Sequence, residues 1–187
     1  MSPLKVHTVE SAPEKSCPTL ESVRKNYGFV PNLFGALAES PAAVESYAAV
    51  SGALARGRFS ATEQQLLAIS ISAENGCEYC VAAHSTVAGM QKVPPATVAA
   101  VREGKTLPDP KLQALRTFAL QVVQKRGWLD QKDLEAFFVA GYDQGHVLEV
   151  LTWVSLKTLS NYANHIAKTP VDAAFSAQRW SKGSKAA

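Results

Sequence analysis

Two cysteines and a histidine at helical spacing are the residues of this sequence with the clearest chemical potential. Cys77, Cys80 and His84 lie within the segment Glu74-Asn-Gly-Cys-Glu-Tyr-Cys-Val-Ala-Ala-His. Residues three and four apart share one face of a helix, so the two sulfurs can approach bonding distance. A thiolate can attack a peroxide or exchange disulfides, and a neighbouring thiol can resolve the resulting sulfenic acid. The spacing therefore predicts redox chemistry.

The backbone expected around these residues also bears on their reactivity. Asn75-Gly76 breaks one helix, and a new helix is expected from about Cys77 to Met90. Unpaired backbone donors and the helix dipole favour a thiolate at a helix N-terminus, which points to Cys77 as the more acidic thiol. His84 follows Cys80 by one turn, so its imidazole is expected to reach that sulfur or a water beside it.

Three other interpretations of the cysteines are weaker. A structural zinc site needs four ligands, but this segment offers three candidates and the chain has no second Cys-x-x-Cys. Haem attachment needs a histidine directly after the second cysteine, where Val81 stands. Two inert, buried cysteines remain the alternative to redox chemistry. We therefore expect no metal and no cofactor.

The composition suits one compact domain that binds neither nucleic acid nor membranes. The chain has 187 residues, 47% of them hydrophobic, and a net charge of +3 that is too small to indicate a nucleic-acid partner. No apolar run is long enough to span a bilayer. The N-terminus has no apolar signal-peptide core, so we expect a cytoplasmic protein. Three cysteines, Cys17 included, are too few for a disulfide scaffold.

Helix signals recur along the whole chain, and no alternating strand pattern persists, so the sequence predicts an all-α fold. Ser40-Pro41, Ser60-Ala-Thr-Glu63, Asp130 and Asp143 are typical helix starts. Residues 1–18 are expected to form an arm, 19–180 one helical domain, and 181–187 a tail. The helices are expected at 19–27, 33–38, 41–55, 61–74, 77–90, 95–104, 112–126, 131–141 and 144–167, with Pro108-Asp-Pro110 as a stiff, non-helical linker.

A degenerate two-fold repeat is a further possibility within this fold. Residues 53–60 resemble residues 123–130, and in both segments a helix ends at an Arg-Gly pair before the cap of the next helix. Such a repeat would place Asn161–His165 roughly where Glu78–Cys80 lie in the first copy. The alternative is that junctions of this kind look alike in unrelated helical proteins.

The motif and several other segments resemble one known family. Residues 75–85 are similar to the signature of the alkylhydroperoxidase D-like branch of the carboxymuconolactone decarboxylase family. Residues 28–34, 40–41, 60–73 and 157–172 resemble its peroxidase-related members, so the likeness spans roughly residues 20–180. The resemblance implies an alkylhydroperoxidase D-like helical bundle that assembles as a trimer or hexamer, with the cysteine pair in a cavity near a subunit interface.

The resemblance also implies roles for individual residues. It makes Cys80 the peroxidatic cysteine, Cys77 the resolving cysteine and His84 a proton relay. The family's relay glutamate is replaced here by Gln65, which cannot carry a proton as a carboxylate does. Tyr79 stands where alkylhydroperoxidase D has a histidine.

Three further residues are candidates for the relay or the pocket. Glu74 is near Cys77 in sequence and is a possible substitute for the missing relay carboxylate. Tyr79 is expected to project from another helix face and to line the pocket mouth. His165, with Asn161 and Asn164 on a polar stripe, is expected at the cavity or at an interface.

Together these features predict a thiol-dependent peroxidase or disulfide oxidoreductase. Its partners would be a hydroperoxide substrate, an external dithiol protein as reductant, and further copies of the chain. One alternative is a carboxymuconolactone decarboxylase-like lyase, which needs acid–base groups rather than thiols. The other is a non-enzymatic sensor of oxidative stress, in which a disulfide alters assembly.

Overall fold

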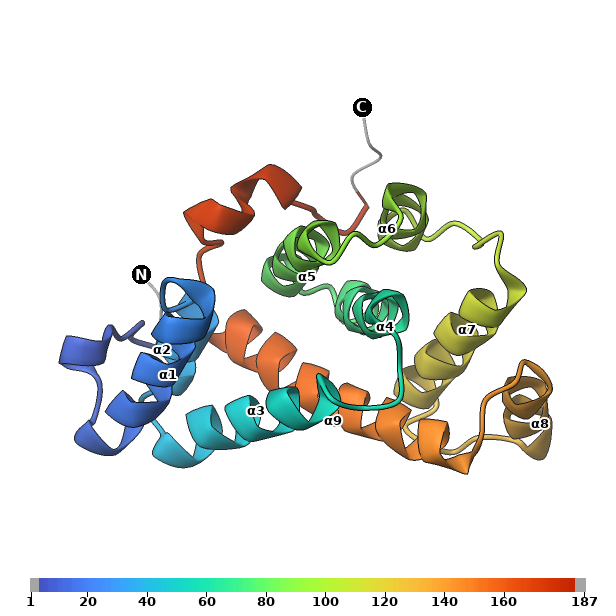
Figure 1. Ribbon diagram of the computed structural model, residues 1–187, viewed down its shortest axis with the longest axis horizontal. Helices are drawn as coiled ribbons and strands as arrows, with labels where there is room; N and C mark the ends of the chain where they lie inside the picture. Colours follow the sequence, from blue (N-terminus) through green and yellow to red (C-terminus); the bar gives the residue numbers. More distant parts are fainter. Residues whose placement is uncertain (1–3, 184–187) are drawn as a thin grey trace.

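The computed structural model describes residues 4–183 and is helical throughout this range, without strands (Figure 1). The predicted all-α class is thus confirmed. The helices are α1 Cys17–Tyr27, α2 Asn32–Leu37, α3 Pro41–Leu54, α4 Ala61–Glu74, α5 Glu78–Met90, α6 Pro95–Arg102, α7 Pro110–Gln124, α8 Gln131–Val139 and α9 Gln144–Ala167, with short 3₁₀ turns η1 Val9–Ser11, η2 Glu14–Ser16 and η3 Ala173–Gln178.

The predicted capping residues set the starts of α3, α4, α8 and α9. The Ser40 side chain accepts a hydrogen bond from the Ala43 amide, and Ser60 and Glu63 form a reciprocal capping box at the start of α4. Two helix starts were predicted two residues too late, and α6, α7 and α8 each end two residues before the predicted end. Helix α1 begins at Cys17 rather than at Thr19, and Pro110 is the first residue of α7, because proline is tolerated in a first turn, where its missing N–H has no helical acceptor.

Helix α4 lies at the centre of the fold and packs on α5, α6, α7 and α9 (Figure 1). All its residues from Leu66 to Ile71 are buried. A helix that is buried on every side is surrounded by other helices, as α4 is here. Its C-terminus leads through Asn75-Gly76 directly into the cysteine segment.

Helix α9 is the longest helix and runs along the lower side of the molecule in Figure 1. It packs on α2, α3, α4, α5 and α7, so it connects both ends of the fold. Its C-terminal half therefore lies against α4 and α5, where the cysteines are.

The segment before α1 is packed against the domain rather than projecting from it. The His7 amide donates to the Gly35 carbonyl at 3.0 Å, and a side chain at Gly35 would place its Cβ 2.5 Å from the His7 carbonyl oxygen. Only glycine permits this close approach. At the other end, Lys182 Nζ donates to the Glu74 carbonyl at 2.8 Å. Residues 1–3 of the predicted arm and 184–187 of the predicted tail lie outside the described residues.

The two junctions that suggested a repeat differ in backbone conformation. Gly127 has a φ of +84°, in the left-handed region, whereas Gly57 does not have a positive φ. The repeat therefore stays a prediction. Within residues 4–183, no helix combines the length and the apolarity that a bilayer crossing requires.

Candidate active site

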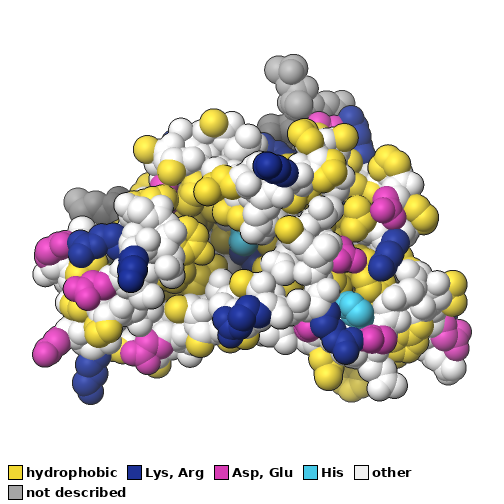
Figure 2. Space-filling model, viewed as in Figure 1, with side chains coloured by type: hydrophobic (Ala, Val, Ile, Leu, Met, Phe, Trp, Pro, Cys, Tyr) yellow, Lys and Arg dark blue, Asp and Glu magenta, His cyan; other side chains and the backbone are white. Residues whose placement is uncertain are grey.

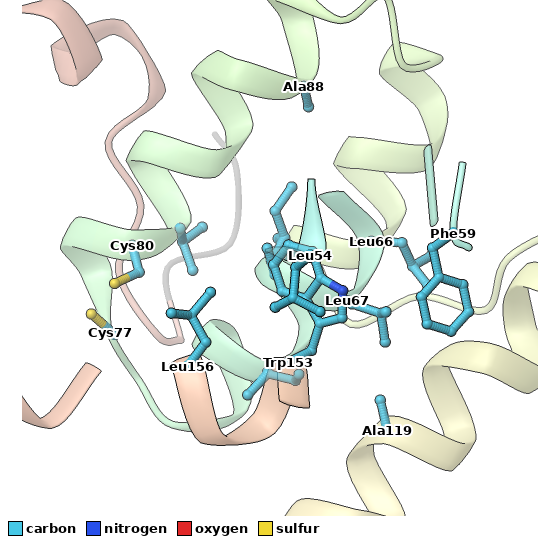
Figure 3. Packing of buried hydrophobic residues seen from close by; sticks show 14 of the residues in the cluster. Leu54, Phe59, Leu66, Leu67, Cys77, Cys80, Ala88, Ala119, Trp153 and Leu156 are labelled. Atoms are coloured by element: carbon cyan, nitrogen blue, oxygen red, sulfur yellow. The ribbon is translucent and has the colours of Figure 1, made fainter. Parts of the chain in front are cut away.

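Cys77 and Cys80 lie at the start of α5 with their sulfurs next to each other, at the edge of the hydrophobic cluster (Figure 3). Cys77 is the N-cap residue, and its amide donates to the Ser72 carbonyl at 2.8 Å. Gly76, with a φ of +72°, provides the turn that brings the chain back from α4. Both cysteines are free thiols, and they are only 1% and 2% exposed.

One face of α9 supplies polar groups to these sulfurs. Asn164 Nδ2 donates to Cys80 Sγ at 3.2 Å and lies 3.8 Å from Cys77 Sγ. Asn161 is held in place because its amide donates to Ser72 Oγ at 3.2 Å. The buried members of this face are Lys157, Ser160, Asn161 and Asn164, which recur at i, i+3, i+4 and i+7.

The two thiols differ in acidity. Burial alone would raise the pKa of Cys80, but the hydrogen bond from Cys77, the charge of Lys157 and the amides of Asn161 and Asn164 together lower that pKa. The pKa of Cys77 is raised, first because its thiol donates to Cys80 and then because it is buried. The expectation that Cys77 is the more acidic thiol was wrong, since this donated hydrogen bond outweighs the helix dipole.

His84 is partly buried between two polar side chains, and neither of its side-chain hydrogen bonds is to a sulfur. Its Nε2 lies 2.9 Å from Lys157 Nζ, and its Nδ1 lies 3.0 Å from Gln65 Oε1. An ammonium group can only donate, so Nε2 accepts, and Nδ1 carries the proton and donates to the Gln65 carbonyl. Burial and the charge of Lys157 lower the pKa of His84 well below its ordinary value, so the ring is neutral.

Gln65, which the resemblance places where the family has a relay glutamate, is buried. Its amide nitrogen donates to Gln91 Oε1 at 3.0 Å, which turns its carbonyl toward His84. Gln65 thus fixes the tautomer of His84 but has no proton to give up. The predicted reach of His84 to the Cys80 sulfur is corrected, because Lys157 occupies the Nε2 side of the ring.

Three predicted candidates have other contacts. Glu74 Oε1 accepts from Gln124 Nε2 at 2.9 Å. Tyr79 is buried and its hydroxyl donates to Asp172 Oδ2 at 2.5 Å, so it ties α5 to the segment after α9 rather than lining a pocket mouth. His165 is exposed beside Tyr162. It follows Asn164 directly, and successive side chains of an α-helix are rotated by about 100°, so it does not share the buried face of Asn164.

Lys157 and Ser160 were not predicted as site residues. Lys157 is completely buried, and Ser160 Oγ lies 3.9 Å from Cys80 Sγ. The signal in the sequence was the spacing of Lys157, Asn161 and Asn164, which share one helix face that excludes His165.

A cavity of about 700 Å³ reaches this site from the surface and has His84 and Gln65 on its wall. Figure 2 shows a hollow at the centre of this face, with hydrophobic walls and a histidine side chain inside. Among the lining residues, all within the part of the chain that the structure describes, none is Asp, Glu, Lys or Arg. They are Asn26, Tyr27, Phe29, Ser51, Ala55, Gln64, Gln65, His84, Thr86, Val87, Met90, Gln91, Trp153, Ala174 and Phe175.

Across the described range, no group of three or more His, Cys, Asp or Glu residues could hold a metal ion. The site is therefore built from a thiol pair, a neutral imidazole, a buried ammonium group and several amides. Such a set can stabilise a thiolate and move a proton.

Residues 41–125, from the start of α3 to the end of α7, match the model of the carboxymuconolactone decarboxylase family. This segment contains both cysteines, His84 and Gln65. A comparison with curated protein sequences gave no match.

Several solved structures share the fold. A peroxidase-related protein with an alkylhydroperoxidase AhpD core from Ralstonia eutropha JMP134 is 24% identical, with a TM-score of 0.82 over 93% of this chain and 94% of that chain. A peroxidase-related protein from Silicibacter sp. TM1040 is 18% identical, with a TM-score of 0.81 over 95% of each chain. The debrominase Bmp8 in complex with 2,3,4-tribromopyrrole is 18% identical, with a TM-score of 0.80 over 95% of this chain and 96% of that chain.

Proposed function

We propose that this chain is a thiol-dependent peroxidase, because residues 41–125 match the model of the carboxymuconolactone decarboxylase family and the thiol pair within them can act as a two-electron reductant. The observation that carries the proposal is the environment of Cys80. Its sulfur accepts hydrogen bonds from Asn164 and Cys77 and lies in the field of Lys157, which together lower its pKa. A thiolate is the form that attacks a peroxide bond.

The cycle uses both thiols. The Cys80 thiolate attacks the hydroxyl-bearing oxygen of a hydroperoxide, the O–O bond breaks, and an alkoxide leaves as Cys80 becomes a sulfenic acid. The Cys77 thiol then attacks the Cys80 sulfur, and its proton leaves with the hydroxyl group as water. An external dithiol protein reduces the disulfide and is itself oxidised. The peroxide has gained two electrons and the dithiol has lost two.

The cavity supports a neutral organic hydroperoxide as the substrate. Its wall combines aromatic and aliphatic side chains with amides, and the described lining carries no charged acid or base. A charged substrate would lose its hydration there without gaining an ion pair. Since the sulfurs are buried and do not line the cavity, turnover requires its wall to move.

Reductive debromination of an aromatic substrate is a second candidate. It is favoured by the likeness to a debrominase and by the aromatic side chains of the cavity, Tyr27, Phe29, Trp153 and Phe175. The same thiol pair would supply two electrons, leaving a disulfide and bromide. The lyase alternative has less support, because the lining offers no carboxylate for acid–base chemistry. A sensor role would require the disulfide to change the assembly.

The test compares cysteine variants in a Cys17→Ser background, which removes the third thiol. Cys80→Ser should reduce turnover of cumene hydroperoxide, with a small dithiol as reductant, to the uncatalysed rate. Cys77→Ser should slow turnover, because the Cys80 sulfenic acid then has to react with the external dithiol instead of a neighbouring thiol. After one equivalent of peroxide, mass spectrometry should find a Cys77–Cys80 disulfide in the Cys17→Ser protein. In Cys77→Ser it should find a sulfenic acid at Cys80.

Retained peroxide turnover in both variants would reject the thiol mechanism. Bromide release from a brominated pyrrole, without peroxide turnover in the Cys17→Ser protein, would instead favour debromination. A change in oligomer size on oxidation, without turnover of either substrate, would favour the sensor.

A further inference from the structure

Lys157 is the most unusual charged group of the site. Its side chain is 0% exposed, and its Nζ donates a hydrogen bond to His84 Nε2 at 2.9 Å. Within residues 4–183, no carboxylate forms an ion pair with it. A buried ammonium group is strongly destabilising unless an anion lies nearby.

The titratable groups around Lys157 leave one candidate for that anion. Helix α5 presents Cys77, Cys80 and His84 to it, and α3 adds Tyr47 beside Cys80. Burial raises the pKa of Tyr47 and lowers that of His84, so both are neutral, and Cys77 keeps its proton in the hydrogen bond to Cys80. Cys80 therefore remains as the candidate for the anion beside Lys157.

The second observation is the way in which His84 separates Lys157 from the cavity. His84 and Gln65 line the cavity wall, whereas Lys157 does not. The ring accepts from Lys157 at Nε2 and presents its N–H at Nδ1 toward Gln65, at the wall. A proton released at Nδ1 can thus be replaced at Nε2 by one from the ammonium group.

We propose that Lys157 is the positioning residue of this site, which holds Cys80 as a thiolate and supplies, through His84, the proton that the leaving group takes up. The pairing with the thiolate is independent of the substrate, whereas the proton transfer rests on the proposed peroxidase function.

The proton transfer balances over the cycle. When the thiolate has displaced an alkoxide, the His84 Nδ1–H bond breaks and its proton forms the alcohol. A Lys157 N–H bond breaks at the same time and its proton forms the Nε2–H bond, which leaves a neutral amine. After the disulfide is reduced, the Cys80 thiol returns a proton to Lys157 and the ring returns to its first tautomer. The thiolate and ammonium pair is then restored.

The first experiment measures the thiolate directly, by its ultraviolet absorbance against pH in reduced Cys17→Ser protein. Lys157→Met should move the ionisation midpoint of Cys80 upward, and Lys157→Arg, which keeps the charge, should restore it at least in part. Lys125→Met is the matched control, since Lys125 is paired with Asp130 and Asp133 at α7 and α8, and it should leave the midpoint unchanged. If Lys157→Met does not fold, Lys157→Gln takes its place.

The second experiment varies the leaving group. If Lys157 supplies the proton, Lys157→Met should lower kcat/KM for an alkyl hydroperoxide, which releases a strongly basic alkoxide, about 100-fold or more. It should lower kcat/KM much less for a peracid, which releases a weakly basic carboxylate. A structural role would reduce both equally.

An unchanged midpoint in the Lys157 variant would overturn the proposal, and equal losses for both substrates would overturn its proton-transfer step. A shifted midpoint in a protein without any peroxide turnover would reject the peroxidase function but keep the thiolate pairing. The failures of the two proposals are thus distinguishable.

Discussion

The polar side chains in the two halves of α9 differ in their exposure to solvent. At its N-terminus, Asp143 caps the helix and pairs with Arg58 at 2.6 Å, and both side chains are more than half exposed. In its C-terminal half, Lys157, Asn161 and Asn164 are buried and face sulfur atoms and an imidazole. The same helix therefore carries an exposed ion pair at one end and a buried polar cluster without carboxylates at the other.

This difference in exposure distinguishes polar groups that stabilise the fold from polar groups that change the acidity of a thiol. Exposed ion pairs contribute little to the free energy of unfolding, because water and salt screen the two charges. Burying an amide or an ammonium group lowers the free energy of unfolding unless the group has a hydrogen-bond partner. A site that buries several such groups together therefore serves a purpose other than stability. Here the gain is a thiol whose pKa is lowered.

The largest effect on stability is expected in the structural region around α7 and α8. Phe118 is buried and its ring stacks on Phe137 with a centroid distance of 4.1 Å. Phe118→Ala should lower the free energy of unfolding by about 3–5 kcal/mol, as measured by denaturant titration. The ionisation midpoint of Cys80 in the folded protein should stay where it is. A shifted midpoint would mean that the two regions are coupled.

A smaller effect, confined to the chemical region, is expected from Asn164→Ala. The amide donates to Cys80 Sγ, and a hydrogen bond to the charged form lowers a pKa. A hydrogen bond to a charged group contributes about 1.5–3 kcal/mol, so its loss should raise the midpoint by about one to two pH units. At a pH between the two midpoints, the variant would hold a thiol where the natural protein holds a thiolate.

Ser16→Ala is the matched control for Asn164→Ala. It removes a buried hydrogen bond, from Ser16 Oγ to the Ala38 carbonyl at 2.7 Å, that touches neither sulfur. It should reduce stability without moving the midpoint. Equal midpoints in Asn164→Ala and the natural protein would show that the amide does not stabilise the thiolate.

The smallest effect is expected at the exposed end of α9. Arg58→Met removes the ion pair with Asp143 but leaves that residue's capping hydrogen bond to the His146 amide. Denaturant titration should show a loss below about 1 kcal/mol, and more salt should reduce the difference. A loss as large as that from Phe118→Ala would contradict the view that this pair is a minor contributor.

The parts that the sequence predicted well depend on local signals. The capping serines, the Gly76 break and the helical run from Leu66 to Ile71 determine nearby backbone, so the fold class and the place of Cys77 and Cys80 could be predicted. The acidity of the two thiols could not, because it depends on which thiol donates to the other. Nor could the contact between His84 and Lys157, which joins residues 73 positions apart.

Tyr79 joins the reactive turn to the cavity. It stands between the two cysteines in the chain, its hydroxyl donates to Asp172, and its ring packs edge-on against Phe175 at 6.1 Å. Asp172 also accepts from the Asn32 amide at the start of α2, and Phe175 lines the cavity. The turn that carries both cysteines is thus fastened, through the Tyr79 ring, to a residue of the cavity wall, so we expect a change in the turn to alter the position of Phe175.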